Sequence, residues 1–153
     1  MSATRPGEYL EDQHHRIDDG IKPVADGAGD WKALAASLAL LRLHLYLEEQ
    51  ILFPVLEKTG LMMPVFVMKR EHGQMWPTLA KLTEACKAQG SLDTVRADCD
   101  ELYKLLRIHN PKEEQIVYTA ADALGAKGAD EHMVATLDAA DAPDDWVCAM
   151  APH

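Results

Sequence analysis

Apolar side chains recur every three or four residues along most of this chain, the spacing that places them on one face of an α-helix. The clearest run begins at Trp31, directly after Asp30, a residue type that caps helix N-termini well. Its leucines stand at helical intervals at positions 34, 38, 41, 45 and 52. Proline and glycine interrupt the pattern and leave four long helical segments, at about 8–22, 31–60, 64–89 and 92–124.

The ends of these segments have local causes. Pro23 and the glycines that follow it end the first segment, and Pro64 suits the first turn of the third. Gly90 is expected to take the left-handed conformation that ends the third segment, and Ser91 to cap the fourth. A shorter amphipathic piece at 129–140 leads into a C-terminal tail, for which we predict no catalytic role.

Four helices of this length, joined by short turns, predict an all-α fold: an up-down-up-down four-helix bundle over about 8–124 with a short C-terminal extension at 125–153. Composition agrees, because leucine and alanine are abundant and only 6% of the residues are aromatic. A chain of 153 residues, 48% of them hydrophobic, can bury one core but is too short for two ordinary domains. We therefore expect a single domain spanning 1–153.

Charge and cysteine content narrow the function. The chain has 15 Lys+Arg against 25 Asp+Glu, a net charge of -10, which disfavours binding to nucleic acid or to an anionic membrane. Its three cysteines form no CxxC pair, so neither a disulfide framework nor a thiolate zinc site is indicated. Without a signal-peptide stretch or an apolar run of about 18 residues, the chain is expected to be a soluble cytoplasmic protein, a monomer or a weak homodimer.

The inward faces of two helices carry polar residues in their middle. Each of these faces steps by 4, 3, 4, 3 and 4 residues, and each places a histidine and a glutamate one helical turn apart among mostly apolar positions. In the second helix the face is Ser37, Leu41, His44, Glu48, Ile51 and Val55, and in the fourth it is Leu102, Leu106, His109, Glu113, Ile116 and Ala120.

The other two helices each place a single histidine in an apolar face. His14 lies between Leu10 and Ile17, and His72 lies between Met68 and Met75. The sequence also repeats itself: the string HxxxEEQI occurs at 44–51 and again at 109–116, an offset of 65 residues, while His14 and His72 are offset by 58. We infer that two helical hairpins are related by an internal duplication.

A pair of metal ions accounts for these residues. An ionised carboxylate in a bundle interior costs several kcal/mol unless it is paired or bound to a metal. Two cations, each held by two imidazoles and bridged by both carboxylates, satisfy all six groups: His14, His44, Glu48, His72, His109 and Glu113. Imidazole and carboxylate ligands favour iron, with manganese or zinc as alternatives, over copper(I). Four protein ligands and a solvent-derived bridge leave a six-coordinate metal one open position for a diatomic molecule or peroxide.

Further ligands are left open by the sequence. His15, Glu49 and Glu114 are the nearest candidates for a fifth ligand. His15 points about 100° away from its neighbour on a helix, and the two glutamates are expected to support the ligands from outside or to be solvated. His132 and His153 are not expected to bind the metals.

The strings that carry these residues resemble a known family. They are His14-x-x-Ile17-Asp18, HLYLEEQILFP at 44–54, Glu71-His72 and HNPKEEQIVY at 109–118. Together they are similar to the hemerythrin-like, or HHE cation-binding, family over about residues 8–124. The resemblance implies a four-helix bundle holding two iron ions in a non-haem centre, bridged by two carboxylates and an oxo or hydroxo group, with the six residues named above as ligands.

The oxygen-carrying hemerythrins differ from this pattern. They use HxxxH in the third helix, where this chain has Trp76 four residues after His72, and their carboxylate follows its histidine in the fourth helix by five residues rather than four. The chain therefore resembles a symmetric branch with four histidines, which disfavours simple oxygen carriage.

Three functions follow as hypotheses. The first is a di-iron protein that binds or reacts with dioxygen, nitric oxide or peroxide in sensing, storage or stress response, supplied by an electron donor. The second is a redox enzyme of peroxide or nitric oxide detoxification, or an iron donor for iron–sulfur cluster repair. The third is a bundle in which zinc or manganese has a structural role only.

Overall fold

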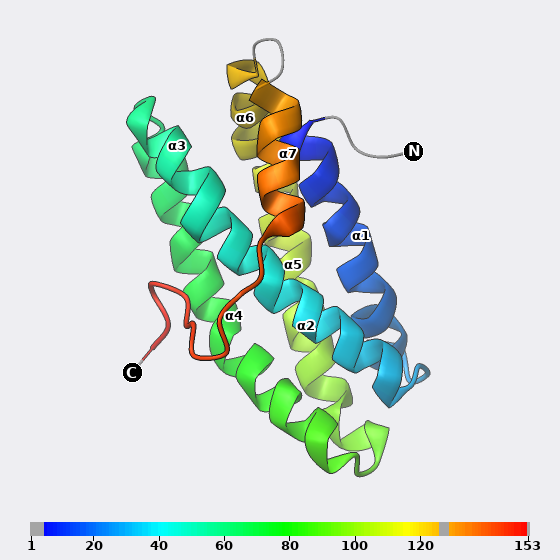
Figure 1. Cartoon of the computed structure of the whole chain (residues 1–153). Coiled ribbons are helices and arrows are strands. Elements are labelled where there is room, and N and C mark those ends of the chain that lie inside the picture. The colour runs from blue at the N-terminus through cyan, green and yellow to red at the C-terminus, as the bar shows by residue number, and fades with distance from the viewer. Residues whose placement is uncertain (1–4, 126–128, 153) are drawn as a thin grey trace.

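The computed structural model describes residues 5–125 and 129–152, and within these ranges it contains helices and no strand. The prediction of an all-α fold is confirmed, and the longer helices lie side by side in a bundle (Figure 1). The α-helices are α1 (Pro6–Ala25), α2 (Trp31–Leu47), α3 (Phe53–Lys58), α4 (Met62–Ala88), α5 (Arg96–Lys112), α6 (Tyr118–Leu124) and α7 (Ala129–Ala139). Three short helical segments of other types join these helices. Two are π-helical, η1 (Glu48–Leu52) and η3 (Glu113–Val117), and one is a 3₁₀ turn, η2 (Leu92–Val95).

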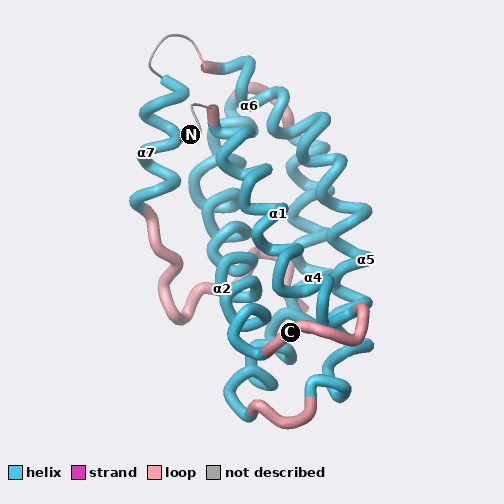
Figure 2. The backbone as a smooth tube through the Cα atoms, turned by 90° about the vertical axis from the view of Figure 1, so that its right-hand side faces the viewer, coloured by secondary structure: helices cyan, strands magenta, loops and turns pink. Residues whose placement is uncertain are grey.

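The bundle is held by a ring of helix contacts. Helix α1 packs against α2 and α5, and α4 packs against the same two helices from the other side. Helix α7 lies outside this ring, beside α1 and α6, as both views show (Figures 1 and 2). After α7 the chain returns as a tail that crosses α4 where the carbonyl of Met150 meets Gly73, at a contact too close for a side chain.

Three predicted helix boundaries are wrong in detail. Helix α1 continues through Pro23 and ends at Ala25, whereas Pro23 was expected to end it. The third long helix ends at Ala88, one residue earlier than expected, so Gln89 rather than Gly90 takes the left-handed conformation, with φ of 49°. The amide of Gln89 bonds to the carbonyl of Ala85 and closes the last turn. The side chain of Ser91 caps no helix. The fourth long helical segment starts instead with the 3₁₀ turn η2.

The two long helical segments that carry the repeated HxxxEEQI string each contain a π-helical turn. In η1 the amide of Phe53 bonds to the carbonyl of Glu48, and in η3 the amide of Tyr118 bonds to the carbonyl of Glu113. Each of these i→i+5 bonds holds one residue more than an α-turn, so the buried face moves on by one position. Ile116, expected on the inward face, is consequently 49% exposed.

The same shift corrects the predicted inward faces beyond both glutamates. Ile51, Val55 and Ala120 are only partly buried. Their places in the core are taken by the residues one position later, Leu52, Leu56 and Ala121, as Val117 takes that of Ile116. Phe53 and Tyr118, the residues that close the two π-turns, are buried as well.

The core consists of two apolar clusters with a polar layer between them. Along α1, Leu10 belongs to one cluster and Ile17 to the other, and His14 lies between them; Met68, His72 and Met75 repeat this order on α4. The two apolar clusters therefore determine the level along the bundle at which the histidines lie together. Within 5–125 and 129–152, every helix is either too short or too polar to traverse a lipid bilayer.

Candidate metal centre

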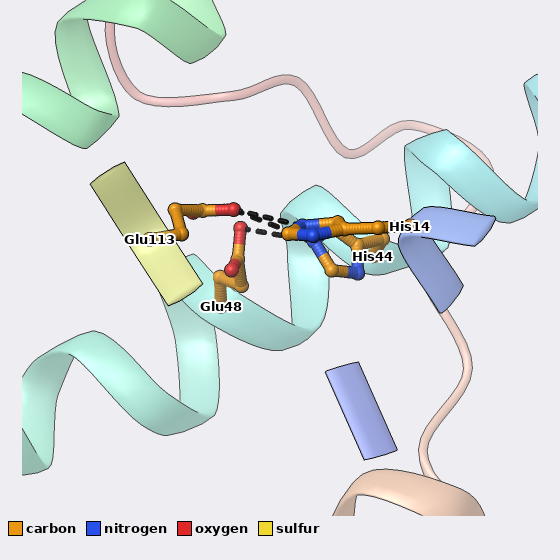
Figure 3. A group of neighbouring side chains, drawn as sticks. All are labelled: His14, His44, Glu48 and Glu113. Atoms are coloured by element: carbon orange, nitrogen blue, oxygen red, sulfur yellow. Dashed lines mark hydrogen bonds and ion pairs between the residues drawn. The ribbon is translucent and has the colours of Figure 1, made fainter. Parts of the chain in front are cut away.

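The six predicted side chains come together in the polar layer. They form two groups that share both glutamates, and within each group the candidate donor atoms lie within 4.8 Å of one another. None of the six is more than 3% exposed. Figure 3 shows the first group, in which the carboxylates of Glu48 and Glu113 point toward the imidazoles of His14 and His44. The second group consists of Glu48, His72, His109 and Glu113.

The two carboxylates face both groups. Glu113 Oε1 lies 3.1 Å from the Nε2 atom of His14, and Glu113 Oε2 lies 3.1 Å from the Nε2 atom of His109. Glu48 Oε1 lies 3.4 Å from the Nε2 atom of His44 and 3.2 Å from that of His72. Each carboxylate is therefore placed to bridge two cations, one in each group.

The outer nitrogen of each of the four inward histidines has an acceptor. Each Nδ1 atom lies 2.7–2.9 Å from a side-chain oxygen, so it carries the ring proton and donates it. The four pairs are His14 with Glu114, His44 with Gln13, His72 with Glu49, and His109 with Glu71. In the neutral rings the Nε2 lone pairs then point into the centre, which is the orientation that metal-binding histidines adopt.

The inward atoms fit a cation. The Nε2 atoms of His14 and His44 are 3.1 Å apart, although two lone pairs at this distance repel each other. Among the described residues, the buried atoms without a hydrogen-bond partner include four from the second group: Glu48 Oε1, His72 Nε2, His109 Nε2 and Glu113 Oε2. Buried polar atoms are rarely left in this state. Two imidazoles and two carboxylates per position suit iron, manganese or zinc.

Without a metal, protons hold the site together. Burial raises the pKa of Glu113, but the positive charge of the nearby His109, together with the contact from His14, outweighs it and keeps this pKa well below its usual value. Burial lowers the pKa of His44, yet Glu48 and Glu113 overcome this and raise it to about 9. Against the effect of burial, Glu113, Glu48 and Glu49 raise the pKa of His72, and Glu113 and Glu71 raise that of His109. The carboxylates therefore attract positive charge into the layer, and metal ions would replace these protons.

The outer acceptors are themselves held in place. A hydrogen bond from His109 lowers the pKa of Glu71 to about 2, with a further contribution from Lys112, which bonds to its other oxygen. Glu49 Oε1 accepts the backbone N–H of Ala149 at 2.9 Å. The C-terminal tail thus supports His72 through Glu49, a structural role that the sequence did not reveal.

The same tail is anchored by an arginine. Arg42 donates to the carbonyl oxygens of Pro143, Asp144 and Trp146 at 2.6–3.2 Å. The ring of Trp146 also meets Trp76 edge to face, with centroids 5.5 Å apart. These contacts fix the tail over the outer face of the second group.

The residues considered for a fifth ligand have other positions. His15 is exposed, and Glu49 and Glu114 bind the outer nitrogens of the histidines, as expected of supporting residues. His132 is exposed on α7, and His153 lies outside the described residues. Sequence reasoning missed Gln13 and Glu71 as outer acceptors, although each directly precedes a predicted histidine ligand.

Sequence reasoning also missed Tyr118. Its hydroxyl lies inside the first group, 2.6 Å from Glu48 Oε2 and 3.1 Å from Glu113 Oε1. The π-turn of η3 places it there, because Tyr118 closes the turn that begins at Glu113. Burial, together with Glu113 and Glu48, raises the pKa of this hydroxyl well above its usual value. The available signal was the repeat, which aligns Tyr118 with Phe53.

Comparison with known proteins identifies the family of the chain. Residues 5–121 match the family described as Hemerythrin HHE cation binding domain. Neither the comparison with curated proteins nor that with solved structures gave a match. The family match covers most of the chain and includes all six inward residues as well as Tyr118. The chain therefore belongs to the hemerythrin HHE cation-binding domain family.

Proposed function

We propose that this chain is a non-haem di-iron protein that binds or reacts with dioxygen, nitric oxide or peroxide. The observation that carries the proposal is the set of buried Nε2 and carboxylate oxygen atoms that face one another without hydrogen-bond partners in the second group. Bound there, two iron ions would supply an exchangeable electron pair and an open coordination position. An electron donor is part of this proposal, because a reduced centre must be restored after each oxidation.

The ligand count supports reactivity over a purely structural role. Each position has two histidines and two shared carboxylates, which is four protein ligands. Iron in such sites commonly takes more than four ligands, so a position remains for a small molecule. The proposal extends to the topology: the long helices run in alternating directions in Figure 1, which supports an up-down-up-down four-helix bundle.

An apolar pocket lies between the two segments that carry His72 and Glu113. It has a volume of about 280 Å³ and lies between α4 and η3. Met68, one turn before His72, contributes to its wall, as do Lys112 and Val117, which flank the Glu113 region in sequence. Because the lining is mostly aliphatic, we propose that it admits diatomic molecules more readily than ions.

Anaerobic reduction followed by exposure to a single reagent tests this function. The iron-loaded protein, reduced without oxygen, is expected to change its visible spectrum on addition of dioxygen, nitric oxide or hydrogen peroxide. The control is the Glu113→Ala variant treated in the same way, which is expected to show no change. A wild-type protein that holds two iron ions and responds to none of the three reagents would contradict the proposal.

The same experiment separates the binding protein from the enzyme. Stoichiometric, reversible changes indicate binding, whereas continued consumption of peroxide or nitric oxide with an electron donor indicates turnover. Metal analysis of the sample identifies the third alternative, because a bundle with structural zinc or manganese would contain no iron and would show no redox response.

A further inference from the structure

The two halves of the centre differ at one ring position. The residue five after each shared glutamate is Phe53 in the first repeat and Tyr118 in the second, at the offset of 65. Phe53 stacks on His72 with ring centroids 5.7 Å apart and 20° between the planes, and Tyr118 stacks on His14 at 5.5 Å and 29°. The two rings are placed alike, so the halves differ here by one hydroxyl oxygen.

That oxygen lies among the donor atoms of the first group. Tyr118 Oη is 3.0 Å from His14 Nε2 and 3.2 Å from His44 Nε2. Its distances to the nearest oxygens of Glu48 and Glu113 are 2.6 and 3.1 Å. Ligand atoms about 2.1 Å from one cation, and at right angles to each other, lie about 3 Å apart. The hydroxyl therefore has the spacing of a fifth ligand to all four neighbours.

Among the residues that the structure describes, none places a corresponding oxygen in the second group. The ring of Phe53 presents only carbon to His72. Four donor atoms of this group lack hydrogen-bond partners. A hydroxyl on the ring at position 53 would contact these atoms, as the hydroxyl of Tyr118 contacts the donor atoms of the first group. Within the described residues, the first group thus offers five protein donors and the second offers four.

We propose that Tyr118 binds the cation held by His14 and His44, and that the cation held by His72 and His109 keeps the open position. This inference rests on the proposed function and adds to it an assignment of which metal meets the small molecule. On binding, the O–H bond breaks, its proton goes to solvent and the oxygen keeps the electron pair as a phenolate. No oxidation or reduction is involved.

The surrounding charges agree with a phenolate in the first group. The outer nitrogen of His44 meets the neutral amide of Gln13, whereas its counterpart His109 meets the carboxylate of Glu71. The outer nitrogens of the remaining two histidines each meet a carboxylate: His14 meets Glu114, and His72 meets Glu49. A phenolate from Tyr118 therefore restores to the first group the negative charge that Gln13 does not supply.

The neutral hydroxyl already has a role in the metal-free protein, where it donates to Glu48 Oε2. A cation between these residues favours the deprotonated oxygen, because a positive charge at bonding distance outweighs the neighbouring carboxylates. Tyr118 is therefore suited to both states, as a hydrogen-bond donor without metal and as a ligand with it.

Visible and resonance Raman spectra of the iron(III)-loaded protein test the assignment. Phenolate bound to iron(III) gives a charge-transfer absorption, and excitation in that band enhances the ring vibrations of the bound tyrosinate. The wild type is expected to show both features. Tyr118→Phe, which copies the natural residue at position 53, is expected to keep its iron and to lose both completely. Tyr46→Phe is the control and is expected to keep them, because Tyr46 packs against Trp146 rather than against the donor atoms.

The outcomes are distinguishable from those of the proposed function. A wild type that binds no iron contradicts the proposed function and this inference with it. A wild type that binds two iron ions without tyrosinate vibrations contradicts only the role of Tyr118, and this reading does not depend on whether the variant folds. The same holds if Tyr118→Phe retains the vibrations.

The reciprocal substitution tests the position of the open site, with sodium azide as the probe. The iron(III)-loaded wild type is expected to bind one azide per chain. Phe53→Tyr, which copies position 118, is expected to gain a second phenolate absorption and to lose azide binding. Azide binding equal to that of the wild type, in a variant with the second phenolate band, would contradict the assignment of the open position to the half with His72 and His109.

Discussion

The two halves of the metal centre are built from the same repeat and differ at three points. The ring beside the first group is a tyrosine and that beside the second is a phenylalanine. The outer acceptors differ in charge, with Gln13 in the first half and Glu71 in the second. The remaining acceptors differ in exposure.

This third difference comes from the C-terminal tail. The tail covers the side chain of Glu49, which is 2% exposed, whereas its counterpart Glu114 is 29% exposed. The inward histidines and glutamates are matched in type, so the duplication supplies the scaffold. The inequality between the two metal positions comes from the residues around them, and the following predictions test how far the halves can be separated.

The largest effect is expected from a residue that both halves share. Glu113→Ala removes one oxygen from each group, so we expect metal content to fall from two ions to none. In the metal-free state the change also leaves buried, positively charged histidines without their partner, a loss of about 3–5 kcal/mol of folding stability. Elemental analysis and thermal unfolding measure the two effects. Full metal content in this variant would show that the carboxylate does not bridge.

Removing one histidine from each half sharpens the comparison. His44→Ala is expected to empty mainly the first position and His109→Ala mainly the second, so each variant should retain about one ion per chain. Both should also melt at lower temperature than the wild type, because metal binding is linked to folding. If metal stoichiometry is unchanged in both variants, these histidines are not ligands.

The metal-free and metal-loaded proteins should respond differently to pH. The pKa of His44 is raised from 6.5 to about 9 in the metal-free fold, so its contribution to stability is fully present below pH 6.5 and is lost as pH rises to about 9. The melting temperature of the metal-free protein should therefore fall over this range. The loaded protein should change less, because a bound histidine carries no proton on Nε2. Parallel curves for both forms would contradict this interpretation.

Exchanging the outer acceptors should change affinity without removing a ligand. Glu71→Gln keeps an oxygen for His109 but removes its charge, and we expect metal affinity at the second position to fall about tenfold. Gln13→Glu is the reverse change in the first half and should raise affinity there. Competition with a chelator measures both. Equal affinities in the two variants and the wild type would mean that these charges do not tune the centre.

The smallest effect is expected on α7. His132 is exposed there and belongs to neither group of candidate donors. His132→Ala should leave metal content, melting temperature and the visible spectrum unchanged. It serves as the control for the other histidine substitutions, and a loss of metal from this variant would show that α7 takes part in the site.

The sequence predicted that the six histidine and glutamate side chains face inward and lie together at one level of the bundle, because helical periodicity holds up to each glutamate. Beyond Glu48 and Glu113 the π-turns move the buried face on by one residue, which simple periodicity cannot detect. Ile116 was therefore placed inside, and Tyr118 was overlooked. Nothing in the 3.6-residue pattern indicates which turns will widen, since the change depends on tertiary packing around the site.

The outer acceptors Gln13 and Glu71 could not be predicted, for a different reason. Gln13 directly precedes His14 in the chain but bonds to His44 on the neighbouring helix. Adjacent residues on a helix point about 100° apart, so the partner of Gln13 depends on how α1 packs against α2. The support that the C-terminal tail gives to Glu49 depends equally on tertiary structure.

The central claim is that six buried side chains hold two iron ions. The most direct measurement is the elemental analysis of wild-type protein purified without added metal. We predict two iron ions per chain. A protein that contains zinc alone, or no stoichiometric metal, would contradict the claim.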